Sequence, residues 1–163
     1  MYNKKVIASK VKEQTIMTNK DSTSVKIKLI TKIRPNEGES ETYEMWLQGS
    51  YIEKSGSAYL RYEEVQNEQS IRTTVKLGNE RALIIRGGAV NMRLPFHIKD
   101  QQLGHYDSEF GSLPLMTHTH TLDFQSELED EKSGRFSVQY DLIMGGQSVG
   151  NYTVDIHFTE VTV

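Results

Sequence analysis

A strict alternation of apolar and polar side chains, repeated along most of the chain, is the feature that most constrains its fold. Within residues 24–34 every second side chain is apolar or threonine, in the order Val25, Ile27, Leu29, Thr31 and Ile33. The same period of two recurs near the C-terminus, over residues 136–144 and 152–158. Successive side chains of a β-strand point to opposite faces of a sheet, so this pattern predicts strands with one buried face and one face in water.

Turn-forming residues divide the chain into about ten such strands. Residues 35–38, 55–57 and 145–147 have the proline, glycine, serine or asparagine content of tight turns. The strand-like segments are 24–34, 41–49, 50–54, 58–66, 70–77, 81–86, 89–98, 103–110, 113–124, 136–144 and 152–158. No convincing helical pattern follows residue 20, so the sequence predicts an all-β domain of antiparallel strands, either a barrel or a sandwich. Short turns favour a single up-and-down barrel, because closure removes the exposed strand edges.

Three expectations concern local detail. Gly87 and Gly88 predict a bulge, a sharp bend or a close backbone approach. Pro95 has no N–H group and predicts an edge or an interruption of its hydrogen-bond ladder. In the segment 113–124 we expect a regular alternation that points one set of side chains inward, namely Leu113, Leu115, Thr117, Thr119 and Thr121.

Residues 1–22 do not follow the strand pattern and are interpreted as a basic extension, either a short helix or a mobile arm, preceding a barrel domain over 23–163. Residues 1–34 hold nine Lys/Arg and two acidic residues, a net charge of +7, which leaves −10 for the remainder. A basic arm attracts the phosphates of nucleic acids. The acidic remainder, and the lack of aromatic residues interleaved with basic ones, argue against nucleic acid as a partner.

The chain has no cysteine, which excludes disulfides, thiolate zinc sites and a catalytic thiol and suits a reducing compartment. The N-terminal lysines are not followed by the apolar core of a signal peptide, and the longest apolar runs are far too short to span a bilayer. We therefore expect a soluble, cytoplasmic protein of one domain, with no membrane span.

Several short motifs occur in an order that resembles one protein family. They are Gly49-Ser50-Tyr51, YLRYEE at 59–64, TVK at 74–76, RGGAVNM at 86–92, Phe110-Gly111 with Leu113 and Leu115, Gly134-Arg135 and YDL at 140–142. Together they cover roughly residues 25–160 and resemble the YwiB-like family of small bacterial proteins of unknown function. This resemblance implies a calycin-like, lipocalin-resembling β-barrel, but it implies no reaction. The basic N-terminal extension departs from the family pattern, so the resemblance implies no role for residues 1–20.

An arginine on an inward face is the leading candidate for a ligand contact. Arg86 shares a face with Ile84 and Met92 if the strand runs regularly through the glycines. A guanidinium among apolar groups must be paired or must reach water. Arg86 therefore either anchors a ligand carboxylate or phosphate, or forms an internal ion pair with Glu63 or Glu64, which is the favoured interpretation.

Tyrosines on inward faces are further candidates, because an aromatic ring with a polar tip suits the wall of a binding cavity. They fit a filled barrel interior equally well. A barrel of about ten strands is wide enough to enclose a cavity, and we predict a small apolar or amphipathic ligand. The predicted ligand-binding residues are Arg86, Tyr62, Tyr106, Tyr140 and Met92.

His118 and His120 lie two residues apart in one strand and would project from the same face, where both could bind one metal ion. The sequence places no third ligand near them. The opposite face of this strand holds the leucines and threonines expected inside, so we interpret the histidines as exposed and predict no metal or cofactor.

No nucleophile elbow, phosphate loop or zinc-protease helix is present in the sequence, so we expect a protein that is not an enzyme. Two hypotheses remain in front. The first is a barrel that binds a small ligand. The second is a ligand-free interaction protein that forms a homodimer or docks on another macromolecule, for which the outward-facing Trp46 and Ile30 are the first candidates.

Overall fold

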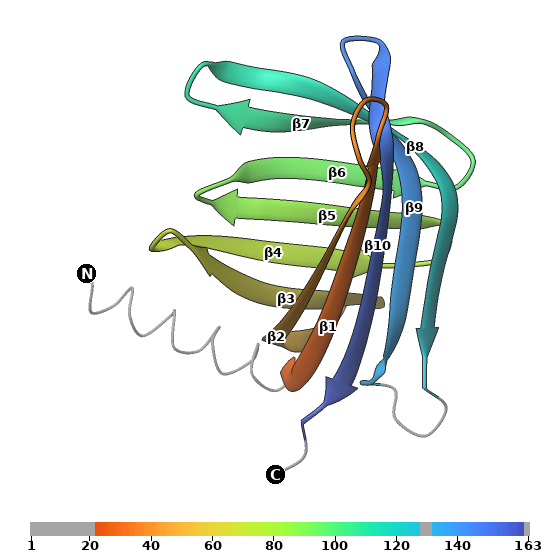
Figure 1. Cartoon of the computed structure of the whole chain (residues 1–163). Helices are drawn as coiled ribbons and strands as arrows, with labels where there is room; N and C mark the ends of the chain where they lie inside the picture. Colours follow the sequence, from red (N-terminus) through yellow and green to blue (C-terminus); the bar gives the residue numbers. More distant parts are fainter. Residues whose placement is uncertain (1–21, 128–131, 162–163) are drawn as a thin grey trace.

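Residues 22–127 and 132–161, which the computed structural model describes, form ten β-strands and no helix (Figure 1). The strands are β1 (Ser22–Pro35), β2 (Glu41–Lys54), β3 (Ser57–Gln66), β4 (Gln69–Leu77), β5 (Arg81–Gly88), β6 (Asn91–His97), β7 (Gln102–Ser108), β8 (Gly111–Ser126), β9 (Gly134–Met144) and β10 (Gln147–Glu160). The two predicted segments 41–49 and 50–54 form the single strand β2. The helix or arm predicted before residue 22 lies outside the described residues.

The strands form one closed barrel in which every strand is antiparallel to both neighbours. Each strand pairs with the next one in the sequence, and β10 pairs with β1 to close the barrel. In Figure 1 the strands β3 to β7 run across the direction of β8, β9 and β10, so the interior lies between two walls of different strand direction. The prediction of an all-β, up-and-down barrel is confirmed.

The two ends of the barrel differ in packing. We call one end, which holds the β2–β3, β4–β5, β6–β7 and β8–β9 links, the packed end, and the other the open end. From the packed end to the middle, most inner-face side chains are buried, and nine are at most 1% exposed, namely Val25, Ile27, Leu60, Val75, Phe96, Phe136, Val138, Ile156 and Phe158. The ring of Phe158 stacks on Tyr51, with centroids 5.6 Å apart. Full burial of each such side chain contributes about 1.5–3 kcal/mol to folding, so this end supplies most of the core.

A β-bulge in β8 changes the predicted alternation. The register between β8 and β9 shifts between Thr119 and Thr121, which leaves His120 without a directly paired residue. Thr119 is buried on the inner face as expected, but beyond the bulge Leu122 is buried and Thr121 is exposed. One extra residue in a strand inverts the alternation that follows it. The prediction that Thr121 faces inward was therefore wrong.

The two predicted irregularities are present. Gly88 has a φ of +96° and approaches β4 so closely that a Cβ there would lie 2.5 Å from the Ser70 carbonyl oxygen. This bend ends β5. The pairing of β6 with β7 stops at Arg93, so Pro95 lies where the ladder on that side is interrupted.

Candidate binding site at the open end of the barrel

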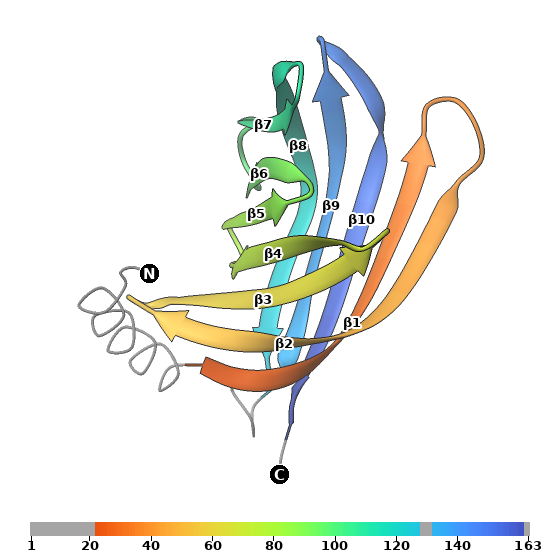
Figure 2. The same ribbon diagram turned by 90° about the vertical axis from the view of Figure 1, so that its left-hand side faces the viewer.

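The inner face of the barrel stays partly exposed to solvent at the open end. The hydrophobic side chains there pack against the core but are only partly buried, namely Met45, Leu47, Met92, Tyr106, Leu142, Met144 and Tyr152. Nearer the rim, Leu113 is 40% exposed and Tyr43 is 51% exposed. The β2–β3 pairing ends with Gly49 opposite Tyr62, and beyond this point the β1–β2 hairpin diverges from β3 (Figure 2). Apolar inner surface therefore reaches water at this end.

A band of directly paired residues crosses five strands here, from β3 to β7. Its members are Tyr62, Thr73, Arg86, Met92 and Tyr106. Residues directly opposite each other in antiparallel strands share a face, and the burial of Tyr62 and Thr73 identifies this face as the inner one.

The band brings together four of the five residues predicted to contact a ligand. The fifth, Tyr140, projects from β9 in the facing wall, and the charge of Arg86 acts on its pKa across the interior. Thr73 was not predicted, because a threonine in an alternating strand carries no signal of its own. Ligand contact by these residues remains a prediction.

Arg86 forms an ion pair inside the barrel. Its Nη2 lies 3.7 Å from Oε1 of Glu64, whose side chain is 7% exposed. The other carboxylate oxygen of Glu64 accepts a hydrogen bond of 3.2 Å from Gln66 Nε2. The predicted internal pair is confirmed, with Glu64 rather than the outward-facing Glu63 as the partner. The Arg86 side chain is 27% exposed, so its guanidinium lies at the boundary between core and solvent.

Two buried tyrosines flank this ion pair. Burial, together with the nearby charge of Glu64, raises the pKa of Tyr62 to about 12, against smaller opposing effects of the Thr73 hydroxyl and Arg86. Burial and the neighbouring Tyr152 also raise the pKa of Tyr140, again against the charge of Arg86. Both hydroxyls therefore stay protonated at neutral pH and can donate hydrogen bonds.

Hydrogen-bonding capacity in this interior is not fully used. The Oγ1 atoms of Thr73 and Thr119 are buried, and neither forms a hydrogen bond of normal geometry with the described residues. The ring of Tyr140 stacks on Tyr152, with centroids 5.4 Å apart, and meets Phe96 at 4.7 Å with the planes tilted by 57°. The open end thus combines aromatic surface with hydroxyl groups.

The two histidines of β8 lie on the outer face, as predicted. Both are exposed, and their rings stack with centroids 4.9 Å apart. His120 Nε2 lies 2.8 Å from Oδ2 of Asp141, and the other oxygen of Asp141 accepts a hydrogen bond from Asn151. Within the described ranges, no group of three or more His, Cys, Asp or Glu residues has an arrangement that could hold a metal ion.

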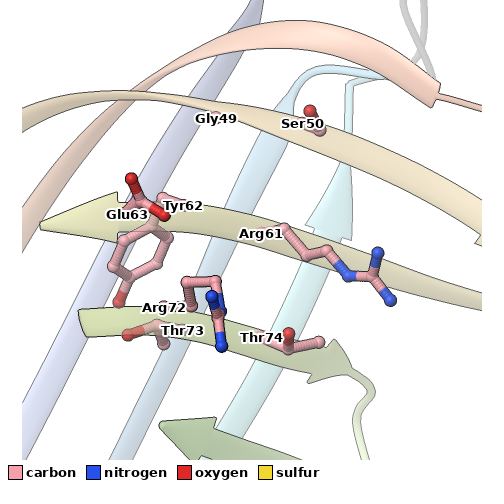
Figure 3. Close-up of a pocket in the computed structure, with 8 residues that line it drawn as sticks. All are labelled: Gly49, Ser50, Arg61, Tyr62, Glu63, Arg72, Thr73 and Thr74. Atoms are coloured by element: carbon pink, nitrogen blue, oxygen red, sulfur yellow. The ribbon is translucent and has the colours of Figure 1, made fainter. Parts of the chain in front are cut away.

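A groove of about 440 Å³ lies where β2 separates from β3 (Figure 3). It is lined by Gly49, Ser50, Arg61, Tyr62, Glu63, Arg72, Thr73 and Thr74. Arg61 comes from β3 and Arg72 from β4, and both are exposed. Their positions alternate with those of the buried Tyr62 and Thr73, so the arginines belong to the outer face of the wall.

Trp46, the first candidate for an outward apolar contact, is 70% exposed on β2. Lys28 Nζ lies 5.1 Å from the centre of its ring, and the same ammonium lies 3.9 Å from Glu44. Ile30, the second candidate, is half-buried. The indole is thus partly covered by a lysine of the neighbouring strand.

Residues 27–156 match the model of a family described as a domain of unknown function, DUF1934. The chain belongs to the DUF1934 family. Over 112 residues it is 34% identical to the uncharacterized β-barrel protein YwiB of Bacillus subtilis strain 168, an alignment that covers 69% of this chain and 77% of YwiB. The crystal structure of the Bacillus subtilis YwiB protein superposes with a TM-score of 0.77 at 28% identity, covering 91% of this chain and 99% of that one.

Membership of the DUF1934 family confirms the resemblance and the barrel, while the function of the family is not known. Among the described residues there is no helix that is long and apolar enough to cross a membrane.

Proposed function

We propose that this DUF1934 barrel binds a small amphipathic molecule at its open end. One observation carries the proposal. Inner-face residues such as Phe136 are fully buried in the body of the barrel, whereas Leu113 on the same face is 40% exposed at the open end. A barrel that served only as a packed scaffold would bury this surface as well. Partly exposed methionine and tyrosine side chains suit an amphipathic ligand, because methionine adapts to varied shapes and tyrosine combines an apolar ring with a hydroxyl.

The polar cluster around Arg86 would hold the polar group of the ligand. The 3.7 Å separation from Glu64 is longer than a hydrogen bond, so the guanidinium keeps donors for another acceptor. Because Glu64 already balances its charge, a neutral head group such as an amide or a hydroxyl would add hydrogen bonds without leaving a charge unpaired. The hydroxyls of Tyr62 and Thr73, from the same band, would supply further contacts.

Binding rather than catalysis is the proposed role. Tyr62 and Tyr140 have raised pKa values, which makes them weaker acids and poorer sources of phenolate at neutral pH. Glu64 is the carboxylate on the inner face of β3 to β7, and it already forms an ion pair with Arg86 and a hydrogen bond with Gln66. These groups support recognition of a polar group more than proton transfer.

Native mass spectrometry of protein purified without refolding tests the proposal. We expect an additional mass that survives gentle ionisation and disappears on denaturation. The variant Met92→Ala, which removes apolar surface from the band, should lose this mass, whereas Trp46→Ala on the outer face should keep it. Two results together would contradict the proposal. The wild-type protein would show only the mass of the chain, and neither lipid nor cofactor extracts would displace an apolar fluorescent dye from it.

A homodimer is the second candidate, supported by the large exposed side chains of Trp46 and Phe110, which are 70% and 91% exposed. Exposed aromatic residues are frequent centres of protein interfaces. Light scattering on the eluting protein would show a dimer that Trp46→Ala or Phe110→Ala dissociates. A monomer at high concentration would contradict this candidate.

A further inference from the structure

The outer face of the wall formed by β3 to β6 is strongly basic. Five exposed cations occupy its outward positions, namely Arg61, Arg72, Lys76, Arg81 and Arg93. Glu63 is the acidic residue on the outward positions of these four strands. None of the five cations has an ion-pair partner within 4.0 Å among residues 22–127 and 132–161. This positive face occurs in a chain whose net charge is −3.

Two of these cations, Arg61 and Arg72, line the groove of Figure 3. Arg61 is paired across the strands with Thr74, and Arg72 with Glu63, so the two arginines are diagonal neighbours on one face. Like charges at such positions repel each other. Glu63 lies directly opposite Arg72 but not within ion-pair distance of it. Two arginines and one glutamate line the groove, so a net positive charge remains there.

We propose that this groove binds the phosphate group of a small molecule such as a nucleoside phosphate, held between Arg61 and Arg72. A guanidinium offers donors in a planar fork that matches two phosphate oxygens. The hydroxyls of Ser50 and Thr74 flank Arg61 in the same row of paired outward residues and can add hydrogen bonds. Arg61 and Arg72 lie on the outer face of the wall, so the phosphate would bind on the opposite face from the ligand proposed for the open end.

The dimensions and surroundings of the groove fit a small molecule. Its volume of about 440 Å³ falls within the roughly 300–1,000 Å³ of pockets for such ligands. Ile85, paired with Thr74 on the next strand, is 41% exposed and offers apolar surface to the part of the ligand that bears no phosphate. Lys76, a diagonal neighbour of Arg61, and Arg93 lie on the same face outside the groove lining and would attract the anion.

Single-stranded nucleic acid fits this face less well. Proteins that bind it stack successive bases on exposed aromatic rings. The aromatic residue on the outward positions of β3 to β6, Tyr59, is half-buried. The face therefore offers charge without a stacking platform.

Calorimetric titration with inorganic pyrophosphate, and then with ADP, tests the proposal. We expect saturable binding of both, weakened about tenfold by Arg61→Gln and by Arg72→Gln, the loss expected when a charge-assisted hydrogen bond is removed. Glu63→Gln should tighten binding, because it removes the carboxylate nearest to the bound anion. The matched control is Arg93→Gln, which removes the same charge from the same face outside the groove and should change the affinity less than about twofold.

Three results would overturn the proposal. One is the absence of heat at millimolar pyrophosphate in low salt. Another is an equal loss of affinity in Arg93→Gln and Arg72→Gln, which would indicate a general electrostatic attraction of the anion to the whole face rather than binding at a defined site. The third is tighter binding of a single-stranded RNA oligonucleotide that depends on Lys76 and Arg93 as much as on Arg61. Arg86→Met should leave pyrophosphate binding unchanged, so a failure at this groove and a failure of the barrel ligand can be told apart.

Discussion

At the packed end of the barrel Leu60 is completely buried, whereas Leu113, on the same inner face at the open end, is 40% exposed. The residue types differ as well. The packed end is filled mainly by phenylalanine and branched aliphatic side chains such as Phe158 and Ile156, whereas at the open end leucine is joined by methionine, tyrosine and one arginine. The first set packs rigidly and has no polar atoms, while the second combines adaptable apolar surface with hydrogen-bonding groups. We infer that the packed end stabilises the barrel and the open end is available for binding.

The same substitution at both ends gives the largest test of this comparison. Leu60→Ala should lower the free energy of unfolding by about 3–4 kcal/mol, because it leaves a cavity in close-packed surroundings. Leu113→Ala should cost less than about 1.5 kcal/mol, since its side chain is already partly in water. Urea denaturation of the two variants measures both values. Equal losses would mean that the open end contributes to the core as much as the packed end does.

The ion pair between Arg86 and Glu64 tests whether the polar side chains at the open end stabilise each other. Arg86→Met leaves the carboxylate of Glu64 buried without its cation, and we expect a loss of about 2 kcal/mol, below the usual value for a buried pair because Arg86 is 27% exposed. The double variant Glu64→Gln/Arg86→Met should recover most of this stability. A double-mutant cycle by urea denaturation measures the coupling. Additive losses would show that the two side chains do not act as a pair.

Much of the barrel was predictable from its sequence, because in most strands the alternation runs unbroken between recognisable turns. The faces of β1, β9 and β10 follow from the alternation alone. The sequence analysis narrowed the ion-pair partner of Arg86 to Glu63 or Glu64. The alternation of faces selects Glu64, because it lies two positions from the inward-facing Tyr62. Thr121 was placed wrongly because no residue type marks the bulge at His120.

The open end and the outer groove were not predictable, since both depend on relations between distant strands. The open end arises where the β2–β3 pairing stops at Gly49 and Tyr62, and alternation continues unchanged through that point. The groove depends on the register that places Arg72 diagonal to Arg61. A single sequence without structure gives the faces of strands but not the register between them.

A smaller effect, confined to high pH, comes from Tyr62, the buried tyrosine of the band. Because the pKa of Tyr62 is raised from 10.0 to about 12, the folded state resists its ionisation. The associated stability is fully present below pH 10 and is lost as the pH rises towards 12, amounting to about 1.4 kcal/mol at pH 11. Tyr62→Phe should remove this part of the alkaline loss, whereas Trp46→Phe on the outer face should not. Unfolding curves at pH 8 and pH 11 compare the two, and an identical alkaline loss in both variants would contradict the assignment.

The smallest expected effect lies on the outer wall, away from both ends. Partial burial acts to raise the pKa of Asp141, but hydrogen bonds from Asn151 and His120, and the charges of His120 and His118, outweigh it and hold this pKa below its ordinary value. A carboxylate with a lowered pKa stabilises the folded state above the pKa of the unfolded chain, near 4, and this contribution is lost as the pH falls through the folded value. Asp141→Asn should therefore cost about 0.5 kcal/mol at pH 7, typical of partly exposed pairs, and less at pH 3. A loss as large as that of Leu60→Ala would mean that the outer network, rather than the packed end, controls the stability of the barrel.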